Sequence, residues 1–258
     1  RDRSVSRGLG DVYKRQGQVV VDVGIHHDMT GVPGLLDRKI AWGTKNIAEG
    51  PAMTREQAIR SIEIGIEIAE ENVRKGYKVF SIGEMGISNT TSSACILGTF
   101  NHWNAIEVTG RGTNISDERL VHKVEVVQKA MDVNHPDPKD GLDVLAKVGG
   151  FEFGCLTGVI LGAAANHAMT IIDGFNTTAS AFIAKALSPQ VSDYLMASHL
   201  SLEQAHKKSL AALGLSEYID LDFRLGESIG AGIQKKMLDM AISVYRECVT
   251  KEEAGVEA

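Results

Sequence analysis

Residues 77–97, which read YKVFSIGEMGISNTTSSACIL, contain the pattern that decides the fold class. Tyr77 to Ile82 form a short, mostly apolar run that predicts a buried strand. Ser88 to Leu97 predict a helix, because its first residues carry the hydroxyl and amide side chains that suit an N-cap. A strand that leads through a glycine-containing loop into a helix is typical of α/β proteins.

The same alternation continues on both sides of this unit. Thr54, with Gln57 three residues later, predicts a capping box at the start of the preceding helix. The strand predicted over residues 18–23 is apolar at nearly every position, and we expect it to be buried on both faces. Helices are predicted over residues 54–75, 88–97, 117–133, 153–167, 178–186, 202–213 and 227–247, and strands over residues 18–23, 77–82, 105–109 and 170–172.

Strands that alternate with helices favour a parallel sheet that is covered on both faces. We therefore expect an α/β fold with three layers, in which helices lie on both faces of a mostly parallel, Rossmann-like sheet. We also expect a small helical subdomain that the C-terminal helix completes.

The composition is that of a globular protein with a mildly acidic charge. The 258 residues are 43% hydrophobic and 23% charged, with a formal net charge of -6. This length can bury a full core, and the negative charge excludes a general nucleic-acid binder. We expect no membrane span and no signal peptide. Three widely spaced cysteines predict free thiols in a reducing compartment, so we expect a cytoplasmic protein.

The first 16 residues, RDRSVSRGLGDVYKRQ, are rich in charge and show neither helical nor strand periodicity. We interpret residues 1–16 as a non-native or disordered tail that contributes nothing to stability. Residues 17–258 are then expected to form a single α/β domain that lacks its N-terminal segment.

Glycine-containing stretches lie where an α/β sheet binds ligands, beyond the carboxyl ends of the strands. In the stretch that follows strand 77–82, Glu84 stands between Gly83 and Gly86, ahead of a helix N-terminus that suits phosphate. A capped turn with a solvated glutamate is an equally good interpretation. The glycine-containing stretches at this edge are residues 83–91, 147–154, 173–175 and 224–232.

Each of the other stretches also has a structural interpretation. Lys147, close to Gly149 and Gly150, could meet a phosphate, or the loop could simply end a helix. Asp173 could bind a ribose hydroxyl or form a turn. Glu227 could complement a helix dipole or present a carboxylate to a pocket, and its spacing alone favours the first.

A possible metal site at His26, His27 and Asp28 is not favoured by the sequence. Adjacent side chains on a strand point to opposite faces, so these residues cannot easily share one ion. We therefore expect no metal.

Taken together, the stretches resemble the nicotinate-nucleotide–dimethylbenzimidazole phosphoribosyltransferase family, from about Val19 to about Val244. Several separate segments match, and they occur in the same order as in the family, so a chance resemblance is disfavoured. The matching segments are NIAEGPAMTR (46–55), GEMGISNTTSSA (83–94), DVLAKVGGFEFGCLTGVILGAA (143–164), DGF (173–175), SH (198–199) and RLGESIGAG (224–232).

The resemblance implies roles for individual residues. Glu227 matches the family's general base, Glu84 matches the second carboxylate of the pocket, and Lys123 matches a lysine that contacts phosphate. The remaining residues that the resemblance places at the substrates are Met85, Gly86, Asn89, Thr90, Gly149, Gly150, Asp173, Ser198, His199 and Gly226.

The implied reaction transfers the phosphoribosyl group of nicotinate mononucleotide to 5,6-dimethylbenzimidazole. Its products are nicotinate and α-ribazole 5′-phosphate, which supplies the lower ligand of cobalamin. The transition state resembles that of an inverting glycosidase, and a positioned carboxylate that accepts the azole proton accelerates it. The resemblance implies a homodimer. We expect no cofactor and, from the charge and the lack of a long apolar stretch, no partner among membranes or nucleic acids.

Two alternatives remain open at this stage: a nucleotide-binding homologue, or a truncated chain, in either case without turnover. Family members have an upstream segment that forms part of the benzimidazole pocket, and here the N-terminal tail replaces it. We therefore expect this chain to be poorly soluble and to bind benzimidazoles weakly. An NAD-linked oxidoreductase is disfavoured because the sequence lacks GxGxxG. The preferred base is not determined by the sequence.

Overall fold

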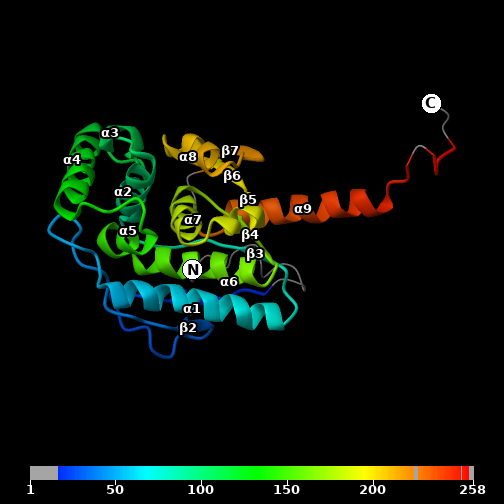
Figure 1. The fold of residues 1–258 in the computed structure, drawn as a ribbon, viewed down its shortest axis with the longest axis horizontal. Helices are drawn as coiled ribbons and strands as arrows, with labels where there is room; N and C mark the ends of the chain where they lie inside the picture. Colours follow the sequence, from blue (N-terminus) through cyan, green and yellow to red (C-terminus); the bar gives the residue numbers. More distant parts are fainter. Residues whose placement is uncertain (1–16, 224–225, 251, 256–258) are drawn as a thin grey trace, which may run out of the picture.

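The computed structural model describes residues 17–223, 226–250 and 252–255, and Figure 1 shows their arrangement. The expectation for residues 1–16 lies outside the described residues.

The centre of the molecule is a pair of helices that lie side by side, α1 (Arg55–Arg74) and α6 (Phe151–Ala165) (Figure 1). The predicted capping box at Thr54 and Gln57 starts α1. A Cβ atom on Gly65 of α1 would lie 1.9 Å from the carbonyl oxygen of Cys155 in α6. A Cβ atom on Gly158 of α6 would lie 1.9 Å from the carbonyl oxygen of Ile62 in α1. The two backbones therefore touch, and only glycine fits at this crossing.

The strands form parallel sheets between the helices. β3 (Val79–Ser81), β4 (Met169–Ile172) and β5 (Leu195–Ala197) make a sheet in the order β3-β4-β5. β4, the central strand, is contacted by α6, α7 (Phe175–Leu187) and α9 (Ile229–Glu247). Two further parallel pairs are β1 (Val20–Asp22) with β2 (Leu35–Asp37), and β6 (His199–Ser201) with β7 (Ile219–Phe223).

The burial expected for strand 18–23 on both faces is wrong. Among the described strands, β1 pairs only with β2, and its apolar side chains pack on one side, against Ile64 and Ile68 of α1 and Cys155 of α6. Within β1 only Asp22 is fully buried. Its carboxylate binds the ammonium group of Lys39 at 2.6 Å and accepts hydrogen bonds from the N–H groups of Gly24 and Ile25.

A group of helices packs beside the central pair and comprises α2 (Asn89–Asn101), α3 (Ala105–Val108), α4 (Asp117–Asn134) and α5 (Gly141–Val148) (Figure 1). The strand predicted over residues 105–109 is wrong, because these residues form α3. Asn104 and Glu107 make a capping box there, which overrides the strand preference of the apolar run. The sequence analysis also missed α5, which Asp140 caps by accepting bonds from the N–H groups of Leu142 and Asp143.

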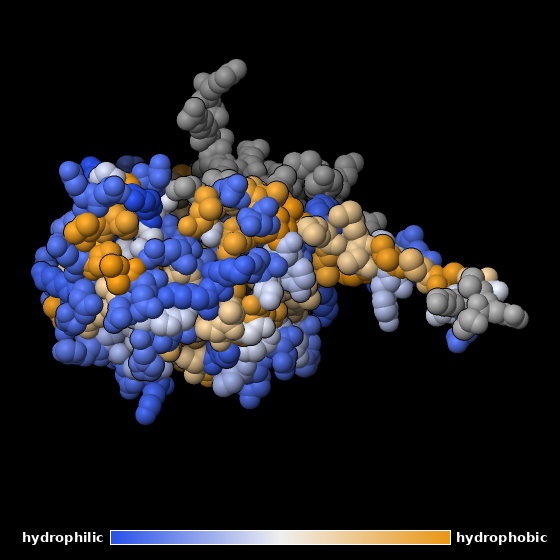
Figure 2. All heavy atoms as spheres, turned by 90° about the horizontal axis from the view of Figure 1, so that it is seen from above, coloured by the Kyte–Doolittle hydropathy of each residue, from blue (hydrophilic) through white to orange (hydrophobic). Residues whose placement is uncertain are grey.

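The C-terminal part of the chain contains α8 (His206–Leu213) and α9. We expected the last helix to complete a helical subdomain, and the structure shows its first turns against β3, β4, β6 and β7. Beyond those turns α9 extends away from the body as an arm, on which apolar side chains are exposed (Figures 1 and 2). None of the helices within the described ranges is long and apolar enough to cross a membrane.

Candidate active site

The parallel order of β3, β4 and β5 brings the residues that follow them to one edge of the sheet. Glu84 follows β3, Asp173 follows β4 and Ser198 follows β5. This edge is where open α/β sheets bind their ligands. The sequence analysis named all three residues, and the structure places them on neighbouring strands.

The structure also brings Glu84 and Glu227 together, although they come from opposite halves of the chain. The N–H group of Glu227 donates a hydrogen bond to the carbonyl oxygen of Glu84 at 3.2 Å. A Cβ atom on Gly83 would lie 2.0 Å from the backbone nitrogen of Ser228, so glycine permits this approach. Glu227 and Ser228 have φ values of 36° and 64°, in the left-handed region. Such strain in residues other than glycine is concentrated at functional sites.

The side chain of Glu84 lies in a network of amide groups. Asn89, at the start of α2, and Asn176, in α7, both donate hydrogen bonds to its carboxylate, the latter at 2.7 Å. Asn176 also donates to the side-chain oxygen of Asn89 at 2.9 Å and accepts a bond from Ser93 at 2.7 Å. These amides fix the orientation of the carboxylate.

Burial raises the pKa of the Glu84 carboxyl above its usual range, and the negative charge of Glu227 adds to the effect. The hydrogen bonds from Asn176 and Asn89 oppose the rise. A carboxylate with a raised pKa is a stronger proton acceptor than an ordinary one. The arrangement therefore suits general-base chemistry.

A third carboxyl group, that of Glu152, belongs to the same network and was missed as a site residue by the sequence analysis. The side-chain nitrogen of Asn89 lies 3.3 Å from Glu152 Oε1. Burial raises the pKa of Glu152 to about 7, and the charge of Glu84 adds to this rise. Glu152 stands in the first turn of α6, where an acidic residue is ordinarily explained by the helix dipole. The pair Gly149-Gly150 directly before it was the signal in the sequence that could have identified Glu152 as a site residue.

Asp173 anchors the start of α9. Its buried carboxylate accepts a hydrogen bond from the N–H group of Ala231 at 2.8 Å and from the N–H groups of Ser228 and Gly230. Burial raises the pKa of Asp173 to about 8, although these hydrogen bonds lower it. Because Glu227 directly precedes this turn, the anchor fixes its position. The ribose contact expected of Asp173 stays a prediction.

Ser198 and His199 are buried behind the sheet edge. The Ser198 hydroxyl donates to the carbonyl oxygen of Asp173 at 2.8 Å, and His199 Nδ1 lies 3.7 Å from Asp173 Oδ1. Burial lowers the pKa of His199 to about 4, so its imidazole is neutral at pH 7. A Cβ atom on Gly230 would lie 1.9 Å from His199 Nδ1, which shows how closely α9 packs here.

Lys123 reaches from α4 to the N-terminus of α2. Its ammonium group donates to the hydroxyl of Thr90 at 2.8 Å and to the carbonyl oxygen of Gly110 at 2.9 Å. Burial lowers the pKa of Lys123, and the nearby carboxylate of Glu203 opposes this. A half-buried cation beside the first turn of a helix suits an anion.

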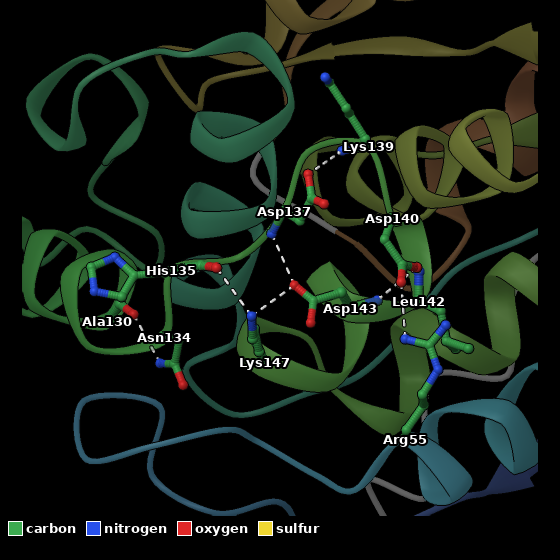
Figure 3. A network of polar contacts seen from close by, with 10 residues as sticks. All are labelled: Arg55, Ala130, Asn134, His135, Asp137, Lys139, Asp140, Leu142, Asp143 and Lys147. Atoms are coloured by element: carbon green, nitrogen blue, oxygen red, sulfur yellow. Dashed lines mark hydrogen bonds and ion pairs between the residues drawn. The ribbon is translucent and has the colours of Figure 1, made fainter.

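The other lysine considered for phosphate, Lys147, is engaged elsewhere, as Figure 3 shows. Its ammonium group lies 2.9 Å from Asp143 in α5 and 3.0 Å from the carbonyl oxygen of His135, at the end of α4. This side chain joins α4 to α5, and we do not assign it to phosphate.

The predicted glycines surround the carboxyl groups. A Cβ atom on Gly226 would lie 3.0 Å from Glu84 Oε1, and one on Gly150 would lie 2.6 Å from Glu152 Oε2. A Cβ atom on Gly86 would lie 2.3 Å from the Asn89 side-chain nitrogen. Gly149 caps the end of α5. Met85 is 70% exposed beside Glu84.

The residues of the N-terminal segment that were considered for a metal make local contacts. His26 Nδ1 lies 2.6 Å from the carbonyl oxygen of Trp42. Asp28 accepts a hydrogen bond from the N–H group of Thr30 at 3.0 Å. Within the part of the chain that the structure describes, no three His, Cys, Asp or Glu residues are grouped so as to hold a metal ion.

The fold and the carboxylates at the sheet edge define an α/β protein equipped for group transfer, and comparison with known families specifies the group. Residues 15–256 match a family model described as Phosphoribosyltransferase. The chain is 47% identical over 237 residues to the nicotinate-nucleotide–dimethylbenzimidazole phosphoribosyltransferase of Geobacter sulfurreducens, a match that covers 92% of this chain and 67% of that protein. It is 46% identical over 248 residues to the enzyme of the same name from Clostridioides difficile, with coverage of 95% and 71%.

Solved structures agree with the sequence matches. The crystal structure of the enzyme of that name from Thermus thermophilus superposes with a TM-score of 0.86 at 37% identity, and the match covers 93% of this chain and 70% of that one. The chain belongs to the nicotinate-nucleotide–dimethylbenzimidazole phosphoribosyltransferase family. This confirms the resemblance seen in the sequence and the expected three-layer α/β fold.

Proposed function

We propose that the chain transfers the phosphoribosyl group of nicotinate mononucleotide to 5,6-dimethylbenzimidazole, which yields α-ribazole 5′-phosphate and nicotinate for the lower ligand of cobalamin. The observation that carries the proposal is the approach of Glu84 and Glu227 at the carboxyl edge of the sheet. The names of relatives that are 46–47% identical to this chain over the matched residues support the same reaction.

In the reaction, the unprotonated ring nitrogen of the benzimidazole attacks the anomeric carbon of the ribose. The bond from this carbon to the pyridinium nitrogen of nicotinate breaks, and its electron pair stays on that nitrogen. The new azolium then loses its N–H proton to a carboxylate. We assign this base role to Glu227, and Glu84 beside it stabilises the positive charge that develops on the sugar.

Lys123 and the first turn of α2 are assigned to the phosphate. The ammonium group already holds the hydroxyl of Thr90 beside the N-terminus of α2. A phosphate there gains both the charge of the lysine and the helix dipole. Asn89, whose side chain binds Glu84, connects this phosphate site to the carboxylates.

Replacing Lys123 by methionine should raise the KM for nicotinate mononucleotide by about 10- to 100-fold and change kcat less, because a charge-assisted contact to a ground-state group is lost. Steady-state kinetics with varied nucleotide check this. Lys129→Met, an exposed position on the same helix, is the matched control. An unchanged KM would remove Lys123 from the phosphate site.

The proposed activity is tested by incubating the chain with nicotinate mononucleotide and a panel of bases that includes dimethylbenzimidazole, adenine and a phenol. Chromatography should show nicotinate release together with an α-riboside phosphate, and only when a base is present. Calorimetry under the same conditions distinguishes the alternative: nucleotide binding without product would identify a nucleotide-binding homologue or a chain without turnover. The panel also identifies the preferred base.

Two further expectations are proposals of the same kind. The family resemblance supports a homodimer, and sedimentation of the purified chain tests it. The proposed reaction is a step of a biosynthesis, which supports a cytoplasmic location.

A further inference from the structure

The carboxyl group of Glu152 has no part in the mechanism above, although it lies in the same network. It is partly buried in the first turn of α6, and its Oε1 lies 3.3 Å from the side-chain nitrogen of Asn89. That same nitrogen donates to Glu84. One amide group therefore spans two carboxyl groups that come from different elements.

The glycines around the network make room for this arrangement. A Cβ atom on Gly150 would lie 2.6 and 2.7 Å from the two carboxyl oxygens of Glu152. A Cβ atom on Gly86 would meet the Asn89 side-chain nitrogen at 2.3 Å and Glu152 Oε1 at 3.2 Å. A side chain at either position would displace the network, because the interior is closely packed. These glycines, which the sequence analysis assigned to substrate, are also required by the contact between Glu152 and Asn89.

The two hydrogens of the Asn89 amide are both committed. One points to Glu84 and the other to Glu152, while the amide oxygen accepts from Asn176. An amide held at three points cannot rotate, and it holds the carboxylate that it binds. Without Glu152, one hydrogen of the buried Asn89 amide would lose its partner. The orientation of the amide, and of the Glu84 carboxylate that it binds, would then be less well defined.

We infer that Glu152 is a positioning residue for the proposed reaction, acting through Asn89 to hold the carboxylate of Glu84 against the reacting sugar. The inference rests on the proposed function, because it concerns the efficiency of that reaction. Glu152 itself needs no contact with either substrate.

The charges around the network give the role a pH signature. The charge of Glu84 raises the pKa of Glu152, because like charges repel. Glu84 also faces Glu227 at the start of α9 and Asp173 at the end of β4, and Glu152 faces the thiol of Cys155 on its own helix. Replacing Glu152 by glutamine should therefore remove an ionisation near pH 7 from this network.

The test compares Glu152→Gln and Glu152→Ala with the unaltered chain in the product assay, with Glu118→Gln, an exposed change on α4, as the matched control. Glu152→Ala should lower kcat about 10-fold or more and leave the KM for nicotinate mononucleotide within about twofold. Glu152→Gln, which keeps an oxygen for Asn89, should restore part of this loss. The pH profile of kcat for Glu152→Gln should lose the ionisation near pH 7 that Glu152 contributes.

A double variant shows whether the effect passes through Asn89. In the Asn89→Ala background, adding Glu152→Ala should cost much less than it does alone, since coupled residues are not additive. Circular dichroism of each variant checks folding, and the glutamine variant decides the matter if the alanine variant unfolds. Wild-type kcat and an unmoved pH profile in the glutamine variant would overturn the inference. Absence of product from the unaltered chain would instead overturn the proposed function.

Discussion

Replacing Glu227 by glutamine is expected to lower kcat by about 10²-fold or more, while nicotinate mononucleotide still binds. Glutamine has nearly the same shape as glutamate but cannot accept the proton that the azole loses. The backbone bond from Glu227 to the carbonyl oxygen of Glu84 is kept in this variant, as is the anchoring of α9 by Asp173. The loss should therefore fall on the chemical step.

Single-turnover kinetics and calorimetric titration of the nucleotide separate the two effects. Glu247→Gln, an exposed change at the far end of the same helix, is the matched control and should leave kcat unchanged. If the Glu227 variant turned over like the unaltered chain, the base would have to be sought elsewhere, with Glu84 as the next candidate.

The largest effect on stability is expected at the crossing of α1 and α6. A Cβ atom at Gly65 would lie 1.9 Å from the carbonyl oxygen of Cys155 and 2.7 Å from the nitrogen of Val159. These are backbone atoms of a buried helix, so no side chain can move aside. Gly65→Ala should lower the free energy of unfolding by about 3 kcal/mol or more, because the helices must separate.

Thermal and denaturant unfolding measure this change. A loss of this size corresponds to a fall in the melting temperature on the order of 10 °C for a domain of this length. The same substitution at Gly50, where a Cβ atom would have nothing within 4 Å, is the control. A melting temperature that Gly65→Ala leaves unchanged would show that the two helices are not in backbone contact.

Local patterns were sufficient to predict the elements whose ends are marked by side chains. The capping box at Thr54 placed α1, and the apolar small-residue run placed α6. Local patterns failed where tertiary packing decides. Residues 105–109 have the composition of a strand, yet Asn104 starts a helix there. The strand at residues 18–23 is as apolar as a central strand, but its apolar side chains pack on one side only, against α1 and Cys155 of α6.

The candidate site was predictable in part for a related reason. Glu84 and Glu227 each follow a glycine, so their positions on ligand-side loops could be inferred from the sequence. Glu152 could not be identified in this way, because an acid in the first turn of a helix has an ordinary electrostatic explanation. Its connection to Glu84 depends on Asn89, which contacts Glu84 five residues away and Glu152 63 residues away in the sequence.

Because Glu227 and Glu84 come from distant parts of the chain, the site is completed late during synthesis on the ribosome. Glu84 and Glu152 emerge from the ribosome with the α1–α6 core, whereas Glu227 emerges only after β7. The core can therefore fold before the second carboxylate is present, and the closure of α9 onto Asp173 comes last. A nascent chain thus holds Glu84 and Glu152 before it holds Glu227, and the pair of carboxylates is completed only when the residues after β7 have been synthesised.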